Sequence, residues 1–225
     1  MKYGETLFDI LYLLLAVIGG IVIARRARSR AEKLMGLAVL VLGLGDAFHL
    51  VPRMIRYFSS AELTAALGLG KLVTSVTMTG FYVCMYYIWL EVYGEAEDRR
   101  ITAAVWALAV LRAALCLFPQ NGWLENSSPL GWAVARNLPF IALGGVIVLL
   151  YYRRRGAVAP FRRIWLYVTL SFLFYIPVAV GAGAAPMLGM LMLPKTVCYI
   201  LLIVIFLRWT LRNVPPAGTS HQNRR

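Results

Sequence analysis

The sequence predicts an all-α integral membrane protein, a bundle of seven transmembrane helices with an external N-terminus and a cytoplasmic C-terminus. Three observations lead to this prediction. First, 60% of the 225 residues are hydrophobic, 15% are charged and mean hydropathy is +0.71, whereas soluble domains are roughly 45–50% apolar and about 25% charged. Second, seven apolar stretches are long enough to cross a bilayer. Third, basic residues gather in alternate loops. These features exclude an ordinary soluble globule and a disordered chain.

The seven stretches match the length of about 20 mainly apolar residues that crosses roughly 30 Å of hydrocarbon. The first is not a cleaved signal peptide, because its basic cluster follows the apolar run instead of preceding it. Short polar or Pro- and Gly-bearing segments separate the stretches. We expect one transmembrane domain over residues 1–212 and a short disordered cytoplasmic tail over 213–225. The predicted spans are 6–24, 34–57, 70–92, 101–118, 130–152, 162–183 and 187–209.

The net charge of +13 comes from 23 basic and 10 acidic residues, and their positions indicate topology instead of nucleic-acid binding. Membrane proteins concentrate Lys and Arg in their cytoplasmic loops. Most basic residues follow the first, third, fifth and seventh spans, whereas the loops at 119–129 and 184–186 have none. The surrounding partner is therefore the lipid bilayer, and no nucleic acid is expected. The sequence leaves open whether the chain forms a homo-oligomer.

Several charged residues lie inside the predicted spans. A charge at mid-helix costs about 2.5–3.5 kcal/mol on insertion scales, so such residues normally face the bundle interior and mark a site. At 1.5 Å per residue they fall between the middle of the membrane and its external surface. Arg56 and Lys71 lie nearer the external helix ends, where they can snorkel to water. The deeper residues are Asp46, Arg53, Arg112, Arg136 and Lys195.

The second span has the clearest pattern, GDAFHLVPRMIR. Asp46, His49, Arg53 and Arg56 are spaced by three, four and three residues, which places them on one helix face. Lipid cannot solvate such a stripe, so it should point into the bundle. Alone, Asp46 and His49 fit a buried structural carboxylate and a packing histidine, but four polar residues in register favour a site.

Basic residues outnumber acidic ones at this depth. Asp46 is the deep acid and Asp9 could supply a second, so two or three cations have no protein partner. We therefore predict an outward-facing basic pocket that binds an anionic small molecule or lipid headgroup in a transporter- or receptor-like protein. Prolines 52, 139, 177 and 194 are expected to kink helices around it. The predicted ligand-binding residues are Asp46, His49, Arg53, Arg112, Arg136, Tyr175, Lys195 and Tyr199.

Seven helices and a lysine midway along the last one resemble the microbial rhodopsins. The sixth span, with Tyr175 and Pro177, is similar to the aromatic-x-x-Tyr-Pro pattern of that family. This resemblance implies retinal as cofactor, with Lys195 forming the Schiff base. The family usually has a carboxylate counterion on its third helix, where this chain has no acid between Lys71 and Glu91. Asp46 on the second span would have to replace it.

Three further motifs resemble an uncharacterised family of bacterial seven-helix membrane proteins, which implies location in the cytoplasmic (inner) membrane as a multi-pass protein. The motifs are GD-x-x-HL-x-PR at Gly45–Arg53, RN-x-PF at Arg136–Phe140 and M-x-PKT at Met192–Thr196. This resemblance points to the same charged positions but implies no substrate. An intramembrane lipid-modifying enzyme stays open as well, although no catalytic motif such as Gly-x-Ser-x-Gly or His-Glu-x-x-His is present.

Overall fold

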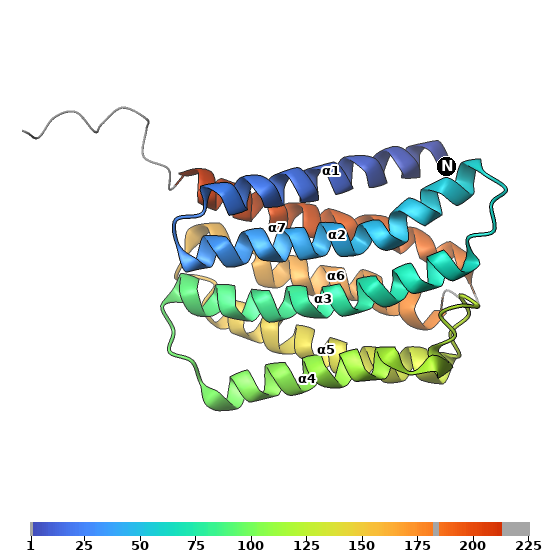
Figure 1. Cartoon of the computed structure of the whole chain (residues 1–225). Helices are drawn as coiled ribbons and strands as arrows, with labels where there is room; N and C mark the ends of the chain where they lie inside the picture. The colour runs from blue at the N-terminus through green and yellow to red at the C-terminus, as the bar shows by residue number, and fades with distance from the viewer. Residues whose placement is uncertain (1, 182–184, 213–225) are drawn as a thin grey trace, which may run out of the picture.

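The computed structural model describes residues 2–181 and 185–212, and all regular structure in this part of the chain is helical (Figure 1). Seven helices are long and apolar enough to cross a membrane, which confirms the seven predicted spans as helices. The predicted tail and the last two residues of the sixth predicted span lie outside the described residues. The helices are α1 Lys2–Arg26, α2 Arg30–Phe58, α3 Thr64–Tyr93, α4 Arg99–Leu117, α5 Leu130–Arg153, α6 Ile164–Gly181 and α7 Met192–Arg212.

The seven helices form a closed ring. Each helix packs against the next one in the chain, and α7 returns to pack against α1. The helices run alternately up and down, so α1, α3, α5 and α7 begin at one end of the bundle, where α2, α4 and α6 end (Figure 1). We call this the N-terminal end and the opposite one the C-terminal end. The ring can therefore enclose side chains from all seven helices at either end.

Local sequence signals explain several helix boundaries. Ser29 caps α2 in a capping box, because its hydroxyl accepts from the Glu32 amide while the Glu32 carboxylate accepts from the Ser29 amide. Asp98 caps α4 by accepting from the backbone amides of Arg100 and Ile101. Gly94 ends α3 with a φ of 63°, a left-handed conformation that glycine adopts without steric cost.

The seventh helix begins later than its hydropathy predicts. Residues Pro186–Leu191 form a short 3₁₀ helix, and the α-helix starts at Met192. Pro194 consequently lies in the first turn of α7, where its missing N–H removes no intrahelical hydrogen bond. The expectation that Pro194 kinks this helix is therefore wrong, whereas Pro52, Pro139 and Pro177 do lie inside helices.

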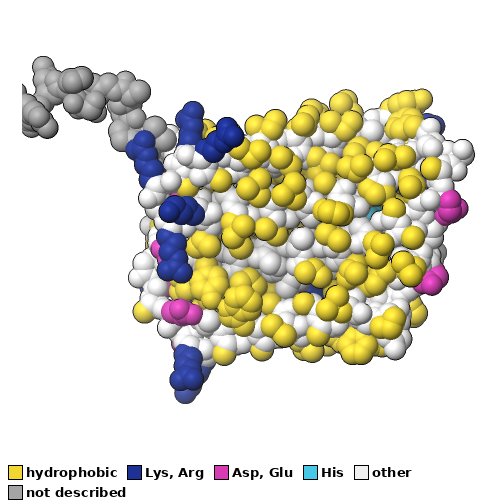
Figure 2. All heavy atoms as spheres, viewed as in Figure 1, with side chains coloured by type: hydrophobic (Ala, Val, Ile, Leu, Met, Phe, Trp, Pro, Cys, Tyr) yellow, Lys and Arg dark blue, Asp and Glu magenta, His cyan; other side chains and the backbone are white. Residues whose placement is uncertain are grey.

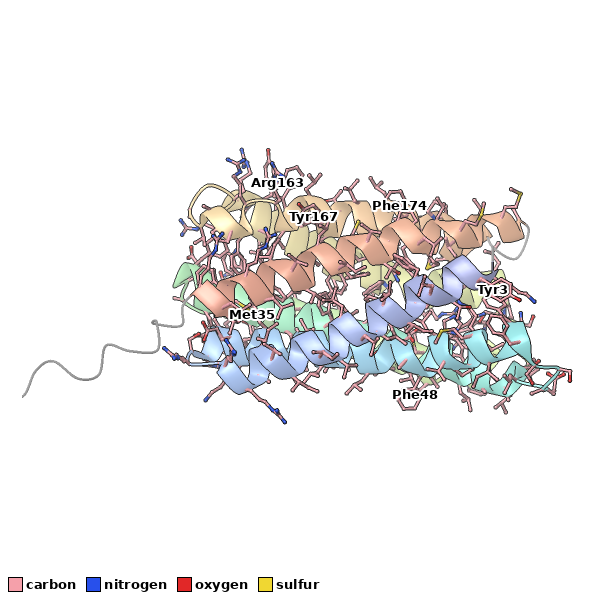
Figure 3. All side chains as sticks on the ribbon, turned by 90° about the horizontal axis from the view of Figure 1, so that it is seen from above. Tyr3, Met35, Phe48, Arg163, Tyr167 and Phe174 are labelled. Atoms are coloured by element: carbon pink, nitrogen blue, oxygen red, sulfur yellow. The ribbon has the colours of Figure 1, made fainter. Side chains whose placement is uncertain are left out.

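The face of the molecule shown in Figure 2 separates by residue type. Hydrophobic side chains cover the long faces of the helices, and Lys and Arg gather around the C-terminal end. Tyr3 and Phe48 point away from the bundle, with 71% and 61% of each residue exposed (Figure 3). An apolar belt of this kind is the surface that a bilayer requires. Because Phe48 faces outward, the neighbouring polar residues of α2 are turned toward the ring interior.

Candidate functional site

The N-terminal end of the ring encloses a cavity of about 550 Å³. All seven helices line it, together with the α4–α5 loop. Of the predicted ligand-binding residues, the structure brings seven to this one cavity, and it does so from five different helices. The seven are Asp46, His49, Arg53, Arg112, Arg136, Tyr175 and Lys195.

One of the predicted ligand-binding residues, Tyr199, does not line the cavity. Tyr199 packs behind the cavity instead of lining it: the residue is 3% exposed and its hydroxyl lies 3.3 Å from that of Tyr82. Arg56, the fourth residue of the α2 stripe, is exposed in the last turn of the helix and does not line the cavity. The first three residues of the stripe, Asp46, His49 and Arg53, therefore line the cavity. Arg56 reaches solvent because it lies in the last turn of α2.

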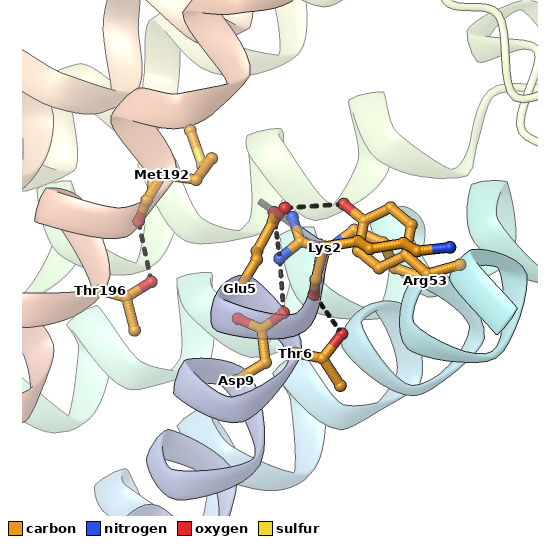
Figure 4. Close-up of polar contacts among 8 residues, drawn as sticks. Lys2, Glu5, Thr6, Asp9, Arg53, Met192 and Thr196 are labelled. Carbon is orange, nitrogen blue, oxygen red and sulfur yellow. Dashed lines mark hydrogen bonds and ion pairs between the residues drawn. The ribbon is translucent and has the colours of Figure 1, made fainter.

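Arg53 is neutralised by α1, contrary to the expectation that it would be free to hold an anion. Its Nη2 lies 2.6 Å from the Asp9 carboxylate and 3.2 Å from that of Glu5 (Figure 4). Tyr57 donates a further hydrogen bond of 2.9 Å to Glu5. The side chain of Asp9 is 4% exposed, so this is a buried ion pair with two acids around one guanidinium. Arg53 is consequently a structural cation.

Asp46 and Lys195 both line the cavity and interact electrostatically. Asp46 accepts a 2.6 Å hydrogen bond from the Tyr12 hydroxyl and interacts electrostatically with Lys195. The Lys195 Nζ lies 5.0 Å from the ring centroid of Tyr175 and 5.4 Å from that of Tyr199. No carboxylate of the described residues comes within ion-pair distance of Nζ, so the two charges interact without direct contact.

Arg136 is held by the α4–α5 loop. Its Nη1 donates 2.6 Å and 3.0 Å hydrogen bonds to Asn121 Oδ1 and Ser128 Oγ, and its guanidinium lies 4.5 Å from the Trp123 ring centroid. Asn121 is itself fixed, because its amide donates to the carbonyls of Leu115 and Phe118. The partners of Arg136 are neutral, so the loop orients this cation without cancelling its charge.

The loop is locked to the bundle through Gly68 of α3. A Cβ at Gly68 would overlap the carbonyl oxygen of Trp123, an atom of the backbone that cannot rotate away. We expect Gly68→Ala to destabilise the protein by about 1–3 kcal/mol through overpacking, measured by thermal unfolding in detergent. Gly145→Ala is the matched control, because nothing lies within 4 Å of its Cβ position. Equal unfolding temperatures for the two variants would contradict this close packing.

Arg112 is the most deeply buried cation of the cavity. The residue is 2% exposed, and its guanidinium carbon lies 3.3 Å from the ring centroid of Phe140. Its Nε and Nη1 are buried and have no hydrogen-bond partner among the described residues. A buried charge of this kind is costly unless it is paired and hydrogen-bonded. Arg112 is therefore a cation that the described protein groups leave uncompensated.

The charges around the cavity do not balance. Asp9 and Asp46 supply the acids of the lining, and Glu5 adds one more behind Arg53. Lys71, which we expected to snorkel to water, is exposed and also lines the cavity. In residues 2–181 and 185–212, Lys71, Arg112, Arg136 and Lys195 have no carboxylate within ion-pair distance. The basic lining residues are Arg53, Lys71, Arg112, Arg136 and Lys195.

Other polar groups of the cavity also lack partners. His49 Nδ1 and Asn126 Oδ1 are buried without a hydrogen bond to any described residue. The described residues contain no group of three His, Cys, Asp or Glu side chains placed to hold a metal ion. Asn126 Oδ1 can only accept a hydrogen bond, so it is the basic side chains of the lining that supply donors and positive charge, the chemistry of an anion site.

Comparison of the chain with protein-family models, with curated proteins and with solved structures gave no match. The two family resemblances thus rest on the sequence motifs alone and stay predictions.

Proposed function

We propose that this chain is a polytopic membrane protein that binds an anionic small molecule or a lipid headgroup in the cavity at its N-terminal end, as a transporter or receptor. The observation that carries the proposal is Arg112. It is a fully buried guanidinium with two unpartnered nitrogens on the cavity wall. A bound anion would supply the missing counter-charge and hydrogen-bond acceptors.

The distribution of basic residues supports access to the cavity from outside the cell. Basic residues gather at the C-terminal end of the bundle (Figure 2), and cytoplasmic loops are enriched in Lys and Arg. We therefore propose that the protein lies in a bacterial inner membrane with the C-terminal end of the bundle facing the cytoplasm. The cavity then opens to the external side, with the exposed Lys71 at its rim.

The size of the cavity favours an organic anion over a bare inorganic ion. Small-molecule sites typically measure about 300–1,000 Å³ and combine apolar walls with a few polar groups. This cavity, at about 550 Å³, has Leu50, Met78, Val178 and Leu193 beside its charged residues. An anionic head could bind among the cations while an apolar part contacts these walls.

Retinal binding is the second candidate, and the interaction of Lys195 with Asp46 favours it, since Asp46 could serve as counterion. We rank it lower because Arg112 also interacts electrostatically with Lys195 and would repel a protonated Schiff base there. Addition of all-trans-retinal tests this alternative: a visible absorption band that Lys195→Ala abolishes would favour retinal over an exchangeable anion.

Thermal unfolding of the purified protein in detergent, with anions added at constant ionic strength, tests anion binding. We expect organic phosphates or carboxylates to raise the unfolding temperature, since a ligand at 100 times its Kd stabilises the folded state by about 2.7 kcal/mol. Arg56→Gln should respond like the unchanged protein, because Arg56 lies outside the cavity lining. Identical unfolding temperatures with every anion and lipid headgroup analogue would contradict the proposal.

A further inference from the structure

The charge distribution inside the cavity deepens the proposed function and rests on it. Arg53 is neutralised by Asp9 and Glu5, and Lys195 interacts electrostatically with Asp46. Lys71 is exposed, so water can solvate its ammonium group. Among the described residues that line the cavity, this leaves the buried Arg112 and the half-buried Arg136 without a counter-charge.

Arg112 and Arg136 lie near each other although they come from different helices. Both line the cavity, and each is within range of the other's charge. Each guanidinium is held against an aromatic ring, Arg112 on Phe140 and Arg136 on Trp123. Rings and neutral hydrogen-bond acceptors orient these groups but leave both positive charges in place. Two fixed, mutually repelling guanidiniums form a site for negative charge concentrated on one group.

We propose that the ligand carries a dianionic phosphate monoester group, which binds between Arg112 and Arg136. A monoanion would leave one of the two guanidiniums without a counter-charge in a low-dielectric environment. A dianion neutralises both, and a tetrahedral phosphate offers acceptor oxygens in several directions at once. The Ser127 hydroxyl lines the same cavity and can donate to an oxygen that the arginines do not reach, whereas the hydroxyls of Thr74 and Ser75 already donate to the backbone carbonyls of Gly45 and Lys71.

The phosphate monoester could belong to a soluble metabolite or to a lipid such as phosphatidic acid, because both present the same head chemistry. The apolar walls of the cavity accept either a short organic group or the first part of an acyl glycerol. The two sources are distinguished by testing a soluble phosphate monoester and a phosphate-bearing lipid separately.

A matched pair of ligands tests the charge requirement on the full-length protein in nanodiscs at pH 8. Phenyl phosphate is a dianion at this pH, because its second pKa is about 6, whereas its methyl diester is a monoanion of nearly the same shape. We expect the monoester to bind at least about tenfold more tightly, measured by isothermal titration calorimetry. For the lipid source, nanodiscs containing phosphatidic acid should weaken phenyl phosphate binding, whereas phosphatidylglycerol, a diester, should not.

Amino-acid substitutions test whether the preference for the monoester over the diester depends on the two arginines. Arg136→Gln should reduce the ratio of monoester to diester affinity to about one, because a single buried cation then remains to be neutralised. Arg56→Gln, which changes an exposed cation at the same end but outside the cavity lining, should keep the ratio. Equal affinities for monoester and diester in the unchanged protein would overturn the dianion assignment while leaving anion binding intact. Absence of binding by both ligands and by carboxylates would instead overturn the proposed function itself.

Discussion

Replacing Arg112 with methionine is expected to make the ligand-free protein more stable and to abolish anion binding. Arg112 is 2% exposed and has two nitrogens without hydrogen-bond partners in the described structure. Replacing buried charges by apolar side chains of similar volume is often neutral or stabilises by about 1–4 kcal/mol. Methionine keeps much of the side-chain volume against Phe140, and its sulfur contacts aromatic rings favourably.

The two halves of this prediction need separate measurements. The free energy of unfolding, measured in detergent without added anion, should rise in Arg112→Met. Titration with phenyl phosphate should give no saturable heat, and added anion should no longer raise the unfolding temperature. Arg112→Lys is the control that restores the charge, and we expect it to recover part of the binding. A less stable Arg112→Met protein that still binds anions would show that Arg112 is a structural residue.

The sequence was sufficient to predict the seven helices. Hydropathy and charge are read directly along the chain, and a span of about 20 apolar residues has few alternatives in a bilayer. Depth could also be predicted, because the rise of 1.5 Å per residue converts position into distance along a helix. For this reason Asp46, Arg112, Arg136 and Lys195 were expected at similar depths in the membrane, and in the structure all four line one cavity.

Pairing between helices could not be predicted in the same way. Which acid contacts Arg53 depends on the rotation and order of the helices in the ring, and nothing in the periodicity of α2 specifies that Asp9 and Glu5 of α1 face it. Charge counting predicted an excess of cations over acids but could not say that Arg53 is paired, whereas Arg112 and Arg136 have no carboxylate partner among the described residues.

The α4–α5 loop was the largest omission. Its residues have no periodic pattern, so Asn121 and Trp123 were treated as a connection, although they orient Arg136. A weak signal was present, since Asn121, Asn126, Ser127 and Ser128 are a polar cluster between two apolar spans. Lys71 was missed because its position near a helix end fits snorkelling equally well.

Replacing Arg53 with methionine is expected to have the opposite effect on stability from the same change at Arg112. The substitution leaves Asp9 buried without its cation, with a side-chain exposure of 4%. Removing one partner of a buried ion pair costs about 3–5 kcal/mol, because the remaining charge is uncompensated. The free energy of unfolding should therefore fall by an amount in this range, measured as for Arg112→Met.

A double variant separates charge from packing in this result. Adding Asp9→Asn to Arg53→Met removes the orphaned charge, so we expect it to recover about 0.5–3 kcal/mol, the range of coupling between residues in contact. Arg56→Met, an exposed arginine on the same helix, should change stability by no more than about 0.5 kcal/mol. If the double variant were as unstable as Arg53→Met alone, lost packing would explain the effect. If the double variant recovers stability as expected, the charge of Arg53 holds α1 to α2. A gain in stability for Arg112→Met, in contrast, would identify Arg112 as a cation whose counter-charge comes from a ligand.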